Sequence, residues 1–178
     1  KAAERFHCSR NTLRESFTRL AAERIVERIP NRGVFLAMPD ADYIRDLFAA
    51  RAAIEPAAVR WGAFPDAPSL VTLTSSAFDY AARGEHQEVS AINQRFHRTL
   101  VAALGSPTLN EQMDNLLARM RLTFLLAIPR YPQLHADHIQ GNITLATLIA
   151  DGKRDEAATL AHDSLMNTCE KILAVLDD

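Results

Sequence analysis

This 178-residue sequence has few cysteines and no long apolar run. Its two cysteines, Cys8 and Cys169, lie far apart and form no metal-ligand pattern, which favours a reducing cytoplasm as the location. No run approaches the roughly 18–20 apolar residues of a membrane-spanning helix, and no signal peptide opens the chain, so we expect no membrane partner. At 48% hydrophobic and 24% charged residues, the composition is that of an ordinary globular protein.

The charges are unevenly distributed along the chain. Residues 1–37 hold eight basic and four acidic side chains, a net charge of +4, whereas the remainder holds 12 basic and 18 acidic side chains, a net charge of −6. A basic head on an acidic body is typical of a nucleic-acid-binding module joined to another domain. We therefore predict a head over 1–37, a linker over 38–40 and a second domain over 41–178.

The start of the head predicts a short helix over Ala2–His7, a turn at Cys8 and a second helix with Ser9 as its N-cap. Apolar residues recur at i, i+4 and i+7 and should bury one side of the second helix: Leu13, Phe17 and Leu20. Polar residues project from the first turns of its other side: Arg10, Asn11 and Arg14. A recognition helix presents side chains to base edges and phosphates from this position.

The rest of the head predicts a β-hairpin. Val26–Ile29 and Val34–Leu36 have the composition of short strands, and Pro30-Asn31-Arg32-Gly33 forms the turn between them with Arg32 at its tip. Two helices and a hairpin make a winged helix, in which a basic wing tip can enter the minor groove. The alternative is a solvated basic helix beside an unrelated hairpin.

From Asp40, a good helix cap, the remaining sequence predicts helices only. Six are expected, over 41–64, 68–82, 85–104, 107–128, 133–150 and 154–176, and Pro56 should kink the first. There is no strand signal after Leu36. The fold class is therefore mainly α: a winged helix-turn-helix followed by an antiparallel all-α bundle.

Several polar residues lie within the apolar stripes of these helices. Asn93 lies in the stripe of its helix with His97 at the edge, and Asn142 and Ser164 lie in the stripes of the last two helices. A buried polar group without a partner costs about 1–3 kcal/mol. The four residues therefore indicate either a lined pocket or separate contacts with neighbouring groups.

Two arginines have similar positions. Arg51 lies in the stripe of the first bundle helix with Glu55 one turn later, so it either pairs with Glu55 or contacts a ligand, because a buried arginine must be paired. Arg119, together with Thr123, flanks the apolar face of the fourth bundle helix.

The head resembles that of the GntR family of transcription regulators. The resemblance lies in the Ser9-Arg10, Arg14-Glu15 and Arg19-Leu20 pairs and in the wing sequence Pro-Asn-Arg-Gly-Val over 30–34. It implies that Arg10, Arg14 and Arg32 are the principal DNA contacts, within a candidate set that also contains Ser9, Asn11 and Gly33. Arg24 stands where the family usually has glycine. The first helix of the usual head has no counterpart here, and we expect a preceding segment to be missing before Lys1.

The second domain resembles the FCD domain, the effector-binding module of the FadR-like subgroup of GntR regulators. The matching segments are Arg51-Ala-Ala-Ile-Glu-Pro-Ala-Ala, Asn93-Gln-Arg-Phe-His-Arg-Thr-Leu, Gly105-Ser-Pro-Thr-Leu and Ile149-Ala-Asp-Gly. Many such domains hold a divalent metal with one aspartate and three histidines, and the metal helps to bind a carboxylate effector. The resemblance also implies that arginines at Arg51 and Arg119 grip that carboxylate.

The four metal-ligand positions correspond here to Asn93, His97, Asn142 and Ser164. Amides and a serine hydroxyl are poor ligands for zinc or nickel, so we predict no metal cofactor. His138, one turn before Asn142, is the candidate substitute ligand, and His162 should face away. The predicted effector site comprises Arg51, Asn93, His97, Arg119, Asn142 and Ser164.

We therefore predict a non-enzymatic, ligand-responsive transcription regulator that binds operator DNA as a homodimer and takes a small organic acid as its effector. Two alternatives stay open: a helical enzyme that uses His97 as a general base, and a dimerisation bundle with a vestigial pocket. Against the enzyme stand the lack of a nucleophile–base pair, of an acid partner for His97 and of a phosphate-binding loop.

Overall fold

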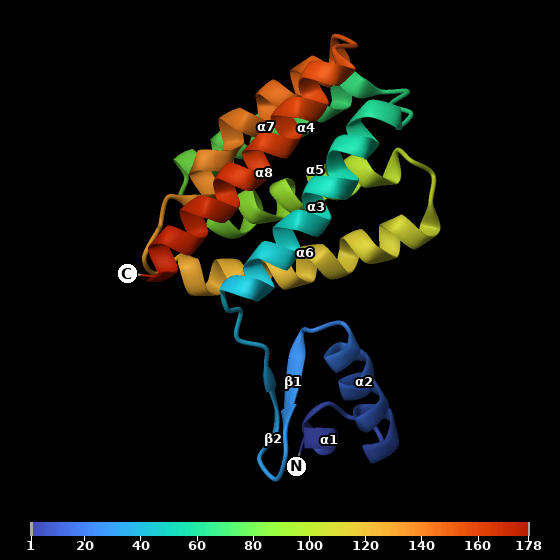
Figure 1. Cartoon of the computed structure of the whole chain (residues 1–178), viewed down its shortest axis with the longest axis vertical. Helices are drawn as coiled ribbons and strands as arrows, with labels where there is room; N and C mark the ends of the chain where they lie inside the picture. Colours follow the sequence, from blue (N-terminus) through green and yellow to red (C-terminus); the bar gives the residue numbers. More distant parts are fainter. Residues whose placement is uncertain (1, 178) are drawn as a thin grey trace. The chain divides into compact units, whose positions relative to one another are not determined.

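The computed structural model describes residues 2–177, so the first residue of the predicted head and the last of the second domain lie outside the described residues. The chain divides into two compact units, one ending at Pro39 and the other beginning at Asp40 (Figure 1). Within the described range, no helix is long and apolar enough to cross a membrane.

The first unit is a winged helix-turn-helix, as the sequence predicts. It consists of α1 (Ala2–Arg5), α2 (Arg10–Ala22), β1 (Val26–Ile29) and β2 (Gly33–Leu36). The strands pair antiparallel, with Val26 opposite Leu36 and Ile29 opposite Gly33. The Ser9 hydroxyl oxygen accepts a hydrogen bond of 3.0 Å from the Thr12 amide, which confirms Ser9 as the N-cap of α2.

The predicted burial of one side of α2 is only partly correct. Leu13, Phe17 and Leu20 are half-buried, and none of the α2 residues, all of which are described, is fully buried. In the described part of the first unit, the elements that accompany α2 are the two-stranded hairpin and the single turn α1. Arg28 of β1 ties the hairpin to α2, because its guanidinium donates to the Arg14 carbonyl at 3.2 Å and to the Thr18 hydroxyl at 2.6 Å.

Arg24 has the backbone conformation that explains why glycine is usual at its position. Its φ is +59°, in the left-handed region. The Ile25 amide donates to the Leu20 carbonyl at 2.9 Å, and the Arg24 amide donates to the Ala21 carbonyl at 3.1 Å. These two bonds form a Schellman motif at the end of α2, in which the left-handed residue is most often glycine.

Replacing Arg24 by glycine should stabilise the head by about 1 kcal/mol, because glycine adopts a positive φ without the steric cost of a Cβ atom. Amide hydrogen exchange of α2 in the full chain measures the effect. Arg24→Ala is the matched control, since it removes the same side chain but keeps the Cβ, and it should give no gain. Equal protection in the glycine and alanine variants would contradict this account.

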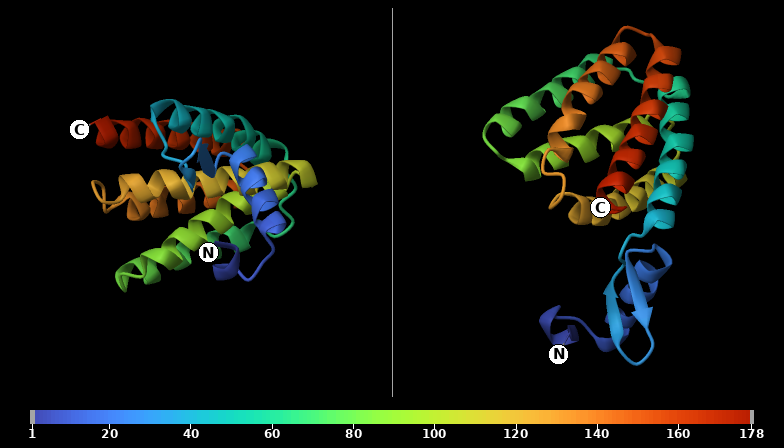
Figure 2. Two further views of the ribbon diagram at one scale, coloured as in Figure 1. Left: turned by 90° about the horizontal axis from the view of Figure 1, so that it is seen from below. Right: turned by 60° about the vertical axis from the view of Figure 1, so that its left-hand side comes forward.

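The second unit is the predicted antiparallel bundle. Its six helices are α3 (Ala41–Trp61), α4 (Ala67–Ala82), α5 (His86–Ala102), α6 (Pro107–Ala127), α7 (Leu134–Ala150) and α8 (Arg154–Asp177). The Asp40 carboxylate caps α3 by accepting from the Tyr43 amide at 2.8 Å. The helix continues through Pro56 to Trp61. The first helix of the bundle, α3, runs antiparallel to the last, α8, and the two lie side by side (Figures 1 and 2).

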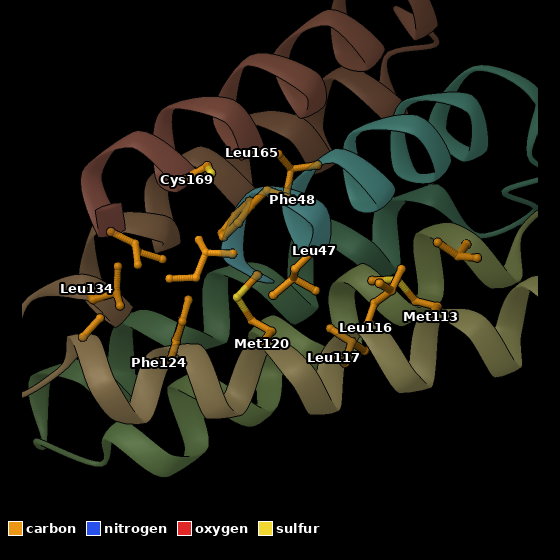
Figure 3. Packing of buried hydrophobic residues seen from close by; sticks show 14 of the residues in the cluster. Leu47, Phe48, Met113, Leu116, Leu117, Met120, Phe124, Leu134, Leu165 and Cys169 are labelled. Atoms are coloured by element: carbon orange, nitrogen blue, oxygen red, sulfur yellow. The ribbon is translucent and has the colours of Figure 1, made fainter. Parts of the chain in front are cut away.

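The main core lies where α3, α6 and α8 meet. Figure 3 shows Met113, Leu117 and Met120 of α6 pointing toward Leu47 and Phe48 of α3, with Leu165 and Cys169 of α8 on the other side. Burying a large apolar side chain contributes about 1.5–3 kcal/mol, so this cluster is the principal source of the bundle's stability.

Arg154 makes a second link between α3 and α8. From the start of α8, its guanidinium donates to the carbonyl oxygens of Val59 and Gly62 at 2.8 and 3.3 Å and lies over the Phe64 ring. These carbonyls belong to the end of α3, where backbone acceptors have no helical partner. The end of the first bundle helix is thus capped by the last one.

Candidate functional site

A cavity of about 200 Å³ lies inside the bundle, between α3, α5, α6, α7 and α8. Its apolar walls are formed by Phe48, Met120, Phe124, Leu145, Ala161 and Leu165. Its polar lining consists of Arg51, Glu55, Asn93, Asp137, Asn142, Ser164, Asn167, Thr168, Lys171 and the histidines His97 and His138. Five of the six residues predicted for the effector site therefore line one cavity.

A chain of polar contacts crosses the cavity from α3 to α5. Arg51 Nε donates to Glu55 Oε1 at 2.5 Å, and Glu55 Oε2 is 2.6 Å from His97 Nδ1. The Arg51 and Glu55 side chains are 4% and 1% exposed, so the pair is buried. Burial acts to raise the pKa of Glu55, but the charges and hydrogen bonds of Arg51 and His97 outweigh it and lower this pKa to about 2. Glu55 is therefore ionised at neutral pH.

The two alternatives predicted for Arg51 are an internal pair with Glu55 and a contact with a ligand. The internal pair with Glu55 exists, yet it occupies only the Nε of the guanidinium, and the buried Nη2 has no hydrogen-bond partner among the described residues. The guanidinium also lies 5.9 Å from the centre of the Phe48 ring. Arg51 thus remains able to donate to a group placed in the cavity.

The expectation that His97 has no acid partner is wrong, because Glu55 supplies one. Sequence periodicity places Glu55 beside Arg51 but gives no sign that it also reaches α5. No hydrogen bond joins Ser164 to His97 in the described part of the chain.

Asn93 and Asn142 contact each other across the cavity wall. Asn142 Nδ2 donates to Asn93 Oδ1 at 2.7 Å, which ties α7 to α5. Both side chains are half-buried, and each keeps one polar group that this bond does not use. Ser164 lines the same cavity but is exposed, so its predicted place at the centre of a buried stripe is wrong. It lies at the exposed rim of the cavity.

His138 leans into the cavity, as the helical spacing suggests. Its ring is stacked on Phe124, with a distance of 6.0 Å between ring centres, and its buried Nε2 has no hydrogen-bond partner among the described residues. Burial, reinforced by the charges of His97 and Arg51, lowers the pKa of His138 to about 4. The ring is therefore neutral at pH 7. His162 is exposed, as expected.

Asp137 and Lys171 line the cavity on its exposed side and were not identified from the sequence. Their charged groups lie 3.8 Å apart, with side chains 38% and 58% exposed. The Tyr131 hydroxyl also donates to Asp137. The spacing of seven residues between Ser164 and Lys171 places both on one face of α8, and this signal could have identified Lys171.

Arg119 does not line the cavity, which corrects its predicted place in the effector site. Its guanidinium donates to Asp46 at 2.7 Å and lies over the Tyr43 ring, so its neighbours are on the first turns of α3. Thr123, its neighbour one turn on, donates its hydroxyl proton to the Arg119 carbonyl. Arg119 therefore serves as a link between α6 and α3.

The head presents a second candidate surface. Arg10 and Arg14 are exposed on α2, and with Gly33 of the hairpin they line a shallow groove of about 490 Å³. Asn11 accepts a hydrogen bond of 3.2 Å from Arg14. Arg32 is exposed at the hairpin turn and lies over the Phe35 ring rather than along the groove. Two of the three principal arginines thus share one surface.

Comparison with known proteins decides between the candidate functions. Residues 2–36 match the model of the bacterial regulatory proteins of the gntR family, and residues 46–167, more than half of the chain, match the FCD domain. The chain is a GntR-family transcriptional regulator with an FCD domain. The predicted family is confirmed, and so is the predicted role as a DNA-binding transcription regulator with a C-terminal effector-binding domain.

Individual relatives agree with this assignment. The regulator is 24% identical over 177 residues to the Nta operon transcriptional regulator of Aminobacter aminovorans, across 98% of its own length and 82% of that protein. It superimposes on a GntR transcriptional regulator from Rhodococcus sp. RHA1 with a TM-score of 0.83 and 26% identity, covering 97% and 84% of the two chains. It shares its fold with E. coli McbR/YncC at a TM-score of 0.78 and 18% identity, covering 99% and 84%.

The residues of this regulator do not fit the divalent metal that the FCD resemblance implies. Two of the four ligand positions carry amides that bond to each other at 2.7 Å, and the third carries the exposed Ser164. His97 alone keeps a typical ligand, and one imidazole does not hold a transition metal tightly. Among the described residues, no group of three or more histidine, cysteine or acidic side chains is arranged to hold an ion.

Proposed function

We propose that the cavity of the FCD domain binds a small organic acid and that this binding alters the affinity of a homodimer for operator DNA in the cytoplasm. The observation that carries the proposal is the buried Arg51 Nη2, which lines the cavity without a hydrogen-bond partner. A buried guanidinium N–H without a hydrogen-bond partner destabilises the folded protein by more than about 1 kcal/mol. A carboxylate is the acceptor that best satisfies it.

The homodimer part of the proposal rests on the symmetry of DNA sites. A winged helix reads a short half-site, and a two-fold dimer doubles the contact on a pseudo-palindromic operator. Residues 1–37 carry a net charge of +4 and the remainder a net charge of −6, so the attraction to phosphates favours the head as the part that contacts DNA.

Arg51→Lys should weaken the binding of short monocarboxylates by about tenfold or more, because lysine keeps the positive charge beside Glu55 but lacks the guanidinium fork. Calorimetric titration and thermal shift with butanoate and 4-hydroxybutanoate measure the effect, since a ligand bound only by the folded state raises its stability.

Arg119→Lys is the matched control for this experiment. It makes the same substitution at a second buried arginine, which pairs with Asp46 outside the cavity, so carboxylate affinity should stay within about threefold of native. Equal losses in the two variants would show that Arg51 has no direct contact with the ligand. If no carboxylate changes the stability of the native chain, the bundle serves dimerisation alone.

A further inference from the structure

Among the described residues that line the cavity, Arg51 is the one buried cation with an unpartnered donor. Arg51 Nη2 is buried and has no partner among the described residues. Lys171 is the other cation of the lining, but it is 58% exposed and lies 3.8 Å from Asp137. One unsatisfied guanidinium nitrogen matches one carboxylate.

The amide pair supplies a different kind of contact. The bond from Asn142 to Asn93 uses one N–H and one carbonyl oxygen, which leaves the Asn93 NH₂ group as a donor and Asn142 Oδ1 as an acceptor. Rotating both side-chain amides by 180° reverses the direction of their hydrogen bond, but it again leaves one NH₂ group and one carbonyl oxygen unused. A ligand group that both donates and accepts, such as a primary amide or a hydroxyl, satisfies this edge, whereas a carboxylate only accepts.

The charges around the cavity oppose a second anionic group. The two cations of the lining each already face a carboxylate, Arg51 with Glu55 at 2.5 Å and Lys171 with Asp137 at 3.8 Å. His138 is neutral because burial lowers its pKa to about 4, so it provides no compensating charge. Burying an uncompensated carboxylate beside these groups is unfavourable.

The volume of the cavity limits the size of the ligand. An apolar cavity of about 150 Å³ accommodates benzene, which has six non-hydrogen atoms. By this measure, the 200 Å³ available here takes a ligand of about eight non-hydrogen atoms. The apolar walls, with Met120 and Phe124 on α6 and Leu165 on α8, suit a short aliphatic chain between two polar ends.

We propose that the effector is a monocarboxylate of about eight non-hydrogen atoms whose other end is an uncharged amide or hydroxyl, bound directly by Arg51 and the Asn93–Asn142 pair without a metal. This inference rests on the proposed function, because it specifies the ligand of the same cavity. In binding the effector, the Asn93–Asn142 pair takes the role that the metal has in the FCD domains that this one resembles.

Isosteric ligand pairs test the proposal on the full native chain. The pairs are malonamate with malonate, succinamate with succinate and glutaramate with glutarate. In each pair, the first compound has an amide in place of one carboxylate of the second. Calorimetric titration should find one of the three amides bound at least about tenfold more tightly than its dicarboxylate isostere. The affinity should be the same with and without EDTA.

The outcomes separate this inference from the proposed function. A dicarboxylate that binds as tightly as its amide, or an affinity that falls on addition of EDTA, overturns the inference and leaves the proposed function standing. If no compound of the series binds, and butanoate does not bind either, both fail.

A double variant, Asn93→Leu with Asn142→Leu, provides an independent check. Removing both amides strands neither partner, so the fold is less perturbed than by one substitution. The variant should bind the preferred amide and butanoate within about threefold of each other, because the edge that distinguishes them is gone. A preference for the amide that persists in the folded variant overturns the role of the amide pair. If the variant fails to fold, the titrations of the isosteric ligand pairs on the native chain decide the question.

Discussion

A variant that carries Asn93→Asp, Asn142→His and Ser164→His should bind zinc or nickel at least about a thousandfold more tightly than the native chain. All three positions line one cavity with His97, and loss of a single outer-shell partner already costs about 10–100-fold in metal affinity. When the Nδ1–H of the neutral His97 ring donates a hydrogen bond to Glu55, the lone pair on Nε2 is available for a metal. Three imidazoles and one carboxylate form a typical transition-metal site.

Titration of chelator-treated protein, followed by elemental analysis, measures this gain. The same triple variant with His97→Ala is the control, and it should lose most of the added affinity because one ligand is missing. About one equivalent of zinc, nickel or manganese in the native chain would contradict the proposal that the amide pair replaces the metal. His138 would then be the first additional ligand to test.

Operator binding by the full-length regulator should weaken by about 1–3 kcal/mol, or roughly 5–150-fold, when Arg14 is replaced by alanine. Arg14 is exposed on α2 and lines the groove between this helix and the hairpin. A side chain in this position reaches a base edge when α2 enters the major groove. Mobility-shift titration at one salt concentration measures the loss.

Arg19→Ala is the matched control for Arg14→Ala. Arg19 belongs to the same helix and carries the same charge, but it pairs with Glu23 at 2.9 Å and does not line the groove. Its loss should weaken binding far less and equally on all sequences, because only the general attraction to phosphates changes. If the two variants lose the same affinity, Arg14 contributes charge but reads no base.

Helical periodicity identifies side chains on the buried face of a helix, and it marks Arg51, Asn93 and Asn142 in this way, with His97 at the edge of such a face. The FCD resemblance then assigns them to one effector site, and all four line the cavity. Periodicity cannot show which polar groups pair, however. The bond between Asn93 and Asn142 and the contact of Glu55 with His97 depend on how separate helices are set against one another.

Arg119 shows where the same reasoning fails. Buried residues lie around much of α6, among them Leu116, Leu122 and Phe124, so this helix has no single buried face. A polar residue beside its apolar stripe therefore points toward one of several neighbours, and here the neighbour is the start of α3. Likewise, the sequence shows that Arg24 departs from the usual glycine, but its positive φ is set by the turn between α2 and β1.

The bond that Arg154 makes with the end of α3 has a consequence for the order of events during synthesis. Val59 and Arg154, which this hydrogen bond joins, are 95 positions apart in the chain. At about 5–20 residues per second, a ribosome needs roughly 5–20 s to add that length. Throughout this interval the nascent α3 lacks α8, the helix with which it packs most extensively. The bundle closes only after its last helix has emerged.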